Sequence, residues 1–93
     1  MRTIERTGQF KRDFKRVAKG RHRLSLEHDL TAVVLALAND MPLADKYRDH
    51  ALSGNWNGYR DCHLKPDLVL FYRKPDENVL QLIRLGSHSE LGI

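Results

Sequence analysis

Histidines and carboxylates gather at one end of the most apolar segment of this sequence. The segment GYRDCHLKPDLVLFY covers residues 58–72, and its LVLFY run is typical of a buried strand. Ionisable side chains are costly to bury and usually face solvent. Yet His63 and Asp67 flank the turn that immediately precedes the apolar run. We therefore expect a functional site where this strand emerges from the core.

Two more histidines are expected at the same edge of the sheet. His88 follows the last predicted strand, and His50 lies in the loop that leads into the sheet. Side chains alternate between the two faces of a strand, so Cys62 and His63 must point in opposite directions. If His63 faces the site, Cys62 faces the core as a small buried thiol. The candidate catalytic residues are His50, His63, Asp67 and His88.

Two kinds of chemistry fit this set of side chains. Three imidazoles and a carboxylate could bind zinc, although the sequence lacks closely spaced ligands such as H-x-x-x-H and has no second cysteine. The alternative is metal-free cleavage of RNA, whose own 2′-OH serves as the nucleophile. A base then removes the 2′ proton and an acid protonates the leaving 5′ oxygen, and histidine suits both roles at neutral pH. Three nearby cations, Arg60, Lys65 and Arg84, are predicted to bind the RNA phosphates.

Each of these residues also has a purely structural interpretation. A loop histidine such as His50 is more often solvated than catalytic, and Asp67 after Pro66 could simply shape the turn. His22 and His28 lack comparable neighbours and are interpreted as surface residues. The convergence of three imidazoles and a carboxylate at one edge of the sheet favours a site over these alternatives.

The composition predicts one globular domain that spans residues 1–93. It is 41% hydrophobic and 30% charged, and no apolar run approaches the ~20 residues of a membrane span. The N-terminal MRTIERTGQF lacks the apolar stretch of a signal peptide, and the single Cys62 cannot form an internal disulfide. These features predict a cytoplasmic protein with no membrane partner.

Positive charge is concentrated in the first quarter of the chain. The net charge is +4, and the segment from Lys11 to Arg23 contains only one acidic residue, Asp13. Such a basic stripe suits a polyanion or an acidic protein, although a solvated helix face explains it equally well. The residues predicted to contact such a partner are Lys11, Arg12, Lys15, Arg16 and Lys19.

Two amphipathic helices are predicted in the first half of the chain. Apolar residues at helical spacing mark the first helix, and Gly20 is placed to end it. Ser25 is a candidate N-cap for the second helix, which Asn39 can end in left-handed geometry before Pro42. The two apolar stripes are Phe10, Phe14, Val17 and Ala18, and Leu26, Leu30, Val33, Val34 and Leu37.

The second half of the chain predicts a sheet. Residues 55–63, 68–73 and 79–86 are expected to form strands joined by the turns KPD and KPDEN, and residues 2–7 a short edge strand. A polar tail, SHSELGI, ends the chain. The order β-α-α-β-β-β predicts an α+β domain in which an antiparallel sheet carries the helix hairpin on one face.

The segment PLADKYRDHALSGNWNGYRDCHLKPDLVLFYR resembles the core of the YafQ toxins, in the RelE superfamily of bacterial toxin–antitoxin systems. It meets the family pattern PLxxxYxDHxLxGxWxGYRDxHxxPDxxLxY and a later R-x-G-x-H, and the resemblance covers essentially the whole chain. The matching residues are Pro42, Leu43, Tyr47, Asp49, His50, Leu52, Gly54, Trp56, Gly58, Tyr59, Arg60, Asp61, His63, Pro66, Asp67, Leu70, Tyr72, Arg84, Gly86 and His88.

The resemblance implies a RelE/ParE-like fold and an mRNA interferase, which is a ribosome-dependent endoribonuclease that cuts mRNA in the A site of the 30S subunit and so inhibits translation. It carries the catalytic roles onto His50, His63, Asp67 and His88, with no metal and no cofactor. The division of roles stays open: Asp67 or His50 is favoured as base and His88 as acid, while His63 orients a partner or stabilises charge. The implied partners are a cognate antitoxin and the ribosome with its rRNA and mRNA; operator DNA is reached only through the antitoxin complex.

One feature departs from the family. YafQ toxins carry an aromatic residue soon after the last histidine, where it can stack on an exposed base. The segment HSELGI offers Leu91 and Ile93 instead. This difference bears on base stacking and codon preference, and leaves the acid–base residues in place.

Two alternative functions remain open. A ParE-like toxin on the same fold would bind DNA gyrase and do no RNA chemistry, which would leave the histidines without a use. A non-catalytic RNA-binding module would depend on the basic stripe and would tolerate loss of the histidines.

Overall fold

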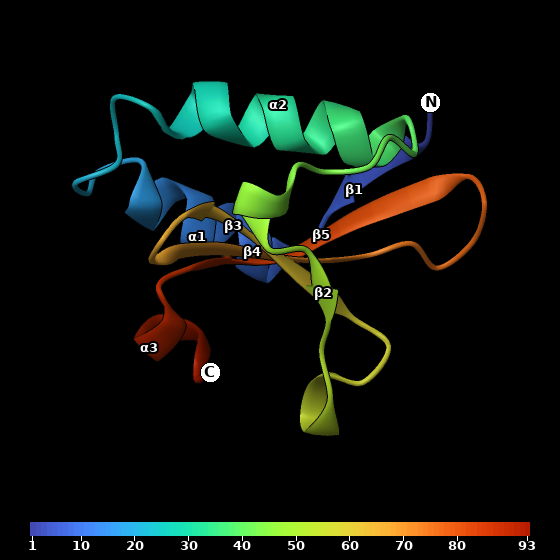
Figure 1. Cartoon of the computed structure of the whole chain (residues 1–93). Coiled ribbons are helices and arrows are strands. Elements are labelled where there is room, and N and C mark those ends of the chain that lie inside the picture. The colour runs from blue at the N-terminus through green and yellow to red at the C-terminus, as the bar shows by residue number, and fades with distance from the viewer.

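The protein folds as one mixed sheet with three α-helices (Figure 1). The structure is a computed structural model that describes all 93 residues. The five strands lie in the order β1-β5-β4-β3-β2. The elements are β1 (Thr3–Arg6), α1 (Gly8–Val17), α2 (Leu26–Ala38), the 3₁₀ turn η1 (Asp45–Tyr47), β2 (His50–Ala51), the 3₁₀ turn η2 (Gly54–Trp56), β3 (Arg60–Lys65), β4 (Leu68–Arg73), β5 (Val79–Gly86) and α3 (His88–Leu91).

The predicted α+β class is confirmed, and the pairing differs from the prediction at both edges of the sheet. β3, β4 and β5 form the expected antiparallel meander, and the short β2 joins it beyond β3. The strand predicted over residues 55–63 begins only at Arg60, because residues 54–56 form the turn η2. At the other edge β1 pairs with β5 in parallel, so the sheet is mixed rather than antiparallel. The residue pattern of a strand reports which side chains are buried, not the direction of its neighbour, so this pairing was not predicted.

The two predicted helices form, with one correction at an end. Thr7 caps α1, because its hydroxyl accepts a hydrogen bond of 3.0 Å from the backbone N–H of Phe10. α2 begins after Ser25, whose side chain makes no capping bond. The left-handed residue beyond α2 is Asp40, with φ 56°, and not Asn39, which has φ −95°. None of the helices combines the length and the hydrophobicity that a membrane span requires.

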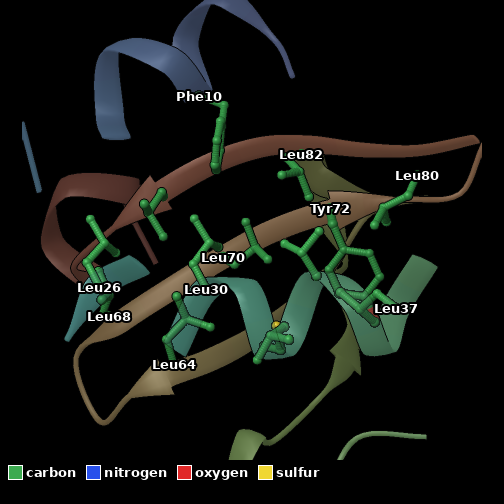
Figure 2. Packing of buried hydrophobic residues seen from close by; sticks show 14 of the residues in the cluster. Phe10, Leu26, Leu30, Leu37, Leu64, Leu68, Leu70, Tyr72, Leu80 and Leu82 are labelled. Carbon is green, nitrogen blue, oxygen red and sulfur yellow. The ribbon is translucent and has the colours of Figure 1, made fainter. Parts of the chain in front are cut away.

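The main core lies between the helix hairpin and one face of the sheet (Figure 2). Phe10 of α1 and Leu30 of α2 meet Leu70 of β4 there. Cys62 of β3 is fully buried in the same cluster, which confirms the direction predicted from strand alternation. Val69 and Phe71 of β4 are buried on the opposite face, so β4 is covered on both sides.

The C-terminal tail is a short helix rather than the polar tail that the sequence predicted. In α3, the Ser87 hydroxyl accepts from the Glu90 N–H while the Glu90 carboxylate accepts from the Ser87 N–H, a reciprocal capping box. Leu91, the last residue of this helix, packs against the second face of the sheet. His88 therefore stands in the first turn of an ordered helix, below the sheet in Figure 1.

Candidate active site

Strand β3 turns two ionisable side chains away from the helices. Cys62 and Leu64 face the main core, so alternation directs Asp61 and His63 to the opposite face of the sheet. Their partners on β4 both belong to the second apolar cluster, which covers that face. This face, with α3 on one side of it, holds the candidate site.

All four predicted catalytic residues come together there. The ring centre of His63 lies 6.4 Å from that of His50 and 5.0 Å from that of His88. Asp67, in the turn between β3 and β4, contacts His88 directly. His50 lies in β2 rather than in a loop, which fixes it beside β3. Residues that are far apart in the sequence thus converge from β2, β3, a turn and α3.

Asp67 fixes the orientation of His88. Its Oδ1 atom lies 2.6 Å from Nδ1 of His88 and accepts the backbone N–H of the same residue at 2.9 Å. The backbone hydrogen bond from His88, and after it the side-chain hydrogen bond, hold the pKa of the Asp67 carboxyl below its usual value. With Nδ1 donating to an ionised carboxylate, Nε2 of His88 is left free to meet a substrate.

His50 is held in the same manner on the other side of His63. Its Nδ1 atom lies 2.8 Å from the carbonyl oxygen of Arg48 and 3.0 Å from Oδ1 of Asp61. Both neighbours are acceptors, so Nδ1 carries the proton and Nε2 is the free nitrogen. The His50 side chain is more than half exposed, so it can be reached from solvent.

Asp61 also lies in the candidate site, although the sequence prediction did not include it among the catalytic residues. Its side chain is buried, with the residue 1% exposed. Its Oδ1 atom accepts no hydrogen bond, although His50 Nδ1 lies 3.0 Å away. Burial raises the pKa of its carboxyl above the usual value, against the opposing pull of His50, His63 and His88. The alternation that placed Cys62 in the core also places Asp61 on the site face, so the signal was present in the sequence.

His63 occupies the middle of the cluster. Burial lowers the pKa of its imidazole, and the positive charges of His88, Arg48 and His50 act in the same direction, while Asp61 opposes them. The ring is consequently neutral at pH 7. A neutral, half-buried imidazole between two oriented histidines is suited to hydrogen bonding with a phosphate oxygen or a sugar hydroxyl.

Arg60 does not join the histidines. Its Nε atom lies 3.3 Å from Asp49 Oδ1 and 3.3 Å from the hydroxyl of Tyr72. Tyr72 belongs to the main core, so Arg60 lies on the helix-facing side of the sheet, opposite His63. A role as phosphate ligand at this site remains a prediction that this placement does not favour.

Lys65 and Arg84, the other two cations predicted to bind phosphate, each contact a carboxylate. Lys65 Nζ lies 2.9 Å from Asp29 of α2. Arg84 Nε lies 2.7 Å from Asp13 of α1, and its side chain is 23% exposed. The charges of both side chains are therefore already partly balanced.

Asp13 is a fully buried carboxylate that ties α1 to the end of β5. It accepts hydrogen bonds from Arg84 at 2.7 Å, Arg16 at 2.9 Å, Gln9 at 3.0 Å and the backbone N–H of Leu85 at 3.0 Å. Burial alone would raise its pKa, but these hydrogen bonds outweigh burial and lower the pKa to about 2. The network contains no free carboxylate oxygen and is therefore a structural anchor.

Arg16 extends this anchor to α3. Its Nε atom lies 2.9 Å from Glu90, and its Nη2 atom donates to the carbonyl oxygen of Leu85 at 2.9 Å. Glu90 is also the acid of the capping box at the start of α3. Since His88 belongs to that helix, α1 helps to position a candidate catalytic side chain.

The remaining cations of the predicted contact surface are free of such bonds. Lys11, Lys15 and Lys19 are exposed and take part in no ion pair, and Arg12 donates only to Gln9. This leaves a basic outer face along α1. Arg16 differs from its neighbours because it belongs to the anchor around Asp13.

No group of three or more His, Cys, Asp or Glu side chains is arranged to hold a metal ion.

Leu91, near the position where the family carries an aromatic residue, is 5% exposed and packs into the second cluster. It therefore presents no surface on which a base could stack.

The chain matches known proteins over nearly its full length. Residues 2–92 match the family described as bacterial toxin of type II toxin–antitoxin system, YafQ. The mRNA interferase toxin YafQ of Escherichia coli K12 is 39% identical over 90 residues, which cover 97% of this chain and 95% of that protein.

Solved structures give the same relationship. A metal-bound toxin from Helicobacter pylori is 47% identical with a TM-score of 0.82, over 98% of this chain and 99% of that one. YafQ in the E. coli DinJ–YafQ complex is 38% identical with a TM-score of 0.81, over 98% of both chains. These matches confirm both the resemblance and the fold inferred from the sequence. The chain is a member of the YafQ family of bacterial toxins from type II toxin–antitoxin systems.

Proposed function

We propose that this toxin is an mRNA interferase, an endoribonuclease that cuts mRNA in the ribosomal A site and so inhibits translation. One observation carries the proposal: His50 and His88 each have Nδ1 occupied by an acceptor, which leaves two free Nε2 atoms around His63. A pair of oriented imidazoles supplies the base and the acid that cleavage at a 2′-OH requires.

In the proposed reaction His50 is the base. Its Nε2 atom takes the proton of the 2′-OH, and the 2′ oxygen attacks the adjacent phosphorus. The bond from phosphorus to the 5′ oxygen breaks, and Nε2–H of His88 protonates that oxygen. The products are a 2′,3′-cyclic phosphate and a 5′-hydroxyl, and each histidine ends in the protonation state in which the other began.

The sequence left Asp67 and His50 as alternative bases, and the hydrogen bonds favour His50. Asp67 Oδ1 already accepts two hydrogen bonds from His88. We assign Asp67 the task of holding the His88 ring and balancing its charge when protonated. His63, neutral at pH 7, is assigned to hydrogen bonding with the phosphate as charge develops there.

RNA rather than DNA is the proposed substrate because the mechanism needs the 2′-OH as nucleophile. No metal enters the proposal, since the oriented histidines perform both proton transfers. The ribosome is the proposed platform, because the exposed lysines of α1 suit rRNA.

A cognate antitoxin is the second proposed partner. The E. coli relative assembles with DinJ, as the DinJ–YafQ complex shows for that protein. We propose that an antitoxin of this chain covers the site face or the basic face of α1, and that operator DNA is bound only through such a complex.

Primer extension tests the function directly. A reporter mRNA is mapped after brief induction of the protein, beside an otherwise identical message without a start codon. Discrete cuts in reading frame on the translated message alone are expected. Growth arrest with intact mRNA would contradict the proposal and direct attention to gyrase binding.

A further inference from the structure

A basic hollow lies beside His63, outside the set of residues that the proposed mechanism uses. Its volume is about 510 Å³. Three cations line it, Lys46, Arg48 and Lys65, against the single carboxylate of Asp29. His63 is among the residues that line it, and its ring also lies close to the other two histidines, so the hollow and the candidate active site share this residue.

The three cations of the basic hollow are not equivalent. Lys65 is paired with Asp29 at 2.9 Å. Lys46 and Arg48 are exposed and take part in no ion pair; the Lys46 ammonium lies 5.1 Å from the ring centre of Tyr47. Like charges repel one another, so two unpaired cations gathered beside a third favour the binding of an anion.

The backbone of Arg48 connects the basic hollow to catalysis. Arg48 is in the left-handed region, with φ 49° and ψ 45°, which is uncommon for a residue other than glycine and is often associated with functional sites. In this conformation its carbonyl accepts the Nδ1 proton of His50, and Arg48 is also one of the residues that line the hollow with His63. Its charge also acts on the His63 ring, which agrees with that proximity.

We propose that the basic hollow binds a phosphate of the RNA strand next to the phosphate that is cleaved, with Arg48 and Lys46 as its ligands. The inference rests on the proposed function, because that function places the scissile phosphate among the three histidines. A strand that leaves the cluster past His63 enters the hollow. There a guanidinium and an ammonium supply charge-assisted hydrogen bonds to its next phosphate.

Salt-dependent binding tests the hollow without relying on cleavage. The probe is a single-stranded oligoribonucleotide with 2′-O-methyl sugars, which lacks the nucleophile, and its affinity is measured by fluorescence anisotropy at several KCl concentrations. Each lost phosphate contact on a single strand reduces the slope of log K against log salt by about 0.7. Arg48→Gln and Lys46→Gln are each expected to show this reduction.

Arg6→Gln is the matched control. Arg6 is an exposed cation of the edge strand β1, which is separated from β3 by β5 and β4. The Arg6→Gln variant should therefore leave the slope unchanged. An equal reduction from Arg6→Gln would overturn the inference, because binding would then reflect diffuse charge. Unchanged slopes for both hollow variants would also overturn it.

Cleavage of translated mRNA separates this inference from the proposed function. If the wild type cuts no message, the proposed function fails, while the salt slopes still decide whether the hollow binds RNA phosphate. If the wild type cuts in frame, Arg48→Gln should lower kcat/KM about tenfold, mostly through KM, and Arg48→Lys should restore part of it. Wild-type kinetics in both Arg48→Gln and Lys46→Gln would overturn the inference about the hollow and leave the proposed function standing. Lys46→Gln is included because it does not alter Arg48, whose carbonyl holds His50.

Discussion

The guanidinium of Arg16 passes over Gly86, in space that any side chain at that position would occupy. A Cβ atom on Gly86 would lie 2.9 Å from Nη2 of Arg16 and 2.9 Å from Oε1 of Glu90. Backbone geometry does not require glycine here, because Gly86 is not among the residues with positive φ. The glycine of the R-x-G-x-H pattern thus makes room for the ion pair that joins α1 to α3, two residues before His88.

Gly86→Ala should therefore impair catalysis more than stability. The added methyl group meets the ends of two flexible side chains, so the Arg16–Glu90 pair opens while the sheet remains intact. Looser positioning of His88 is expected to lower kcat by about tenfold to a hundredfold with little change in KM. Arg16→Met, which removes the pair without adding volume near Gly86, should show the same loss. Full activity in both variants would refute a positioning role for the pair.

The two oriented histidines should each control one limb of the pH–rate profile. The base must be unprotonated and the acid protonated, so activity is expected to fall at both low and high pH. His50→Ala should abolish the acid limb and His88→Ala the alkaline limb, each with a loss of about 10²–10⁴ in kcat. The exposed His28 supplies the control, since His28→Ala should retain both limbs and full activity. If His50→Ala instead removes the alkaline limb, the roles of base and acid are reversed.

Asp61→Asn should reduce activity without reducing stability. Burial raises the pKa of Asp61 in the folded protein, so the ionised form destabilises the fold increasingly as pH rises through that pKa. Asparagine removes this unfavourable charge, and Tm at pH 7 should be equal to or above that of the wild type. In this variant His50 loses the carboxylate that lies 3.0 Å from its Nδ1 atom. We therefore expect kcat to fall about tenfold, which is a fraction of the full effect of acid–base catalysis. Asp45→Asn, at an exposed carboxylate of η1, is the control; wild-type kcat in Asp61→Asn would contradict the assignment.

The buried framework of this site was predictable from the sequence. The run of residues 68–73 forms the most buried strand, and the positions of His63 and Asp67 around the turn before it follow from local pattern alone. The direction of Cys62 also followed from strand alternation, and the same rule applied one residue earlier would have identified Asp61.

Other parts of the site depend on contacts between distant segments. The helical turn that holds His88 is anchored through Arg16, which is remote in sequence, so the tail alone predicted an irregular end. Likewise, the left-handed backbone of Arg48 has no glycine or asparagine to mark it. It is adopted where η1 ends and β2 pairs with β3, and that pairing is a property of the folded sheet.

Asp13 should make the protein sensitive to acid over a defined range of pH. Its pKa is about 2 in the folded protein, against 3.8 as the ordinary value, so the folded state binds the proton more weakly than the unfolded state. A lowered pKa contributes stability that is present above pH ~4 and lost as pH falls toward ~2, by roughly 2 kcal/mol in total.

Urea unfolding of the wild type and Asp13→Asn between pH ~6 and ~2 measures this contribution. At neutral pH the variant should be less stable by about 3 kcal/mol, because Arg84 and Arg16 lose the carboxylate that balances their charges. Asp40→Asn is the matched control: Asp40 is exposed and paired with Arg2 and Lys74, so its loss should change stability far less than the loss of Asp13 does. If wild type and Asp13→Asn lose the same stability between pH ~4 and ~2, the buried network does not account for the acid sensitivity.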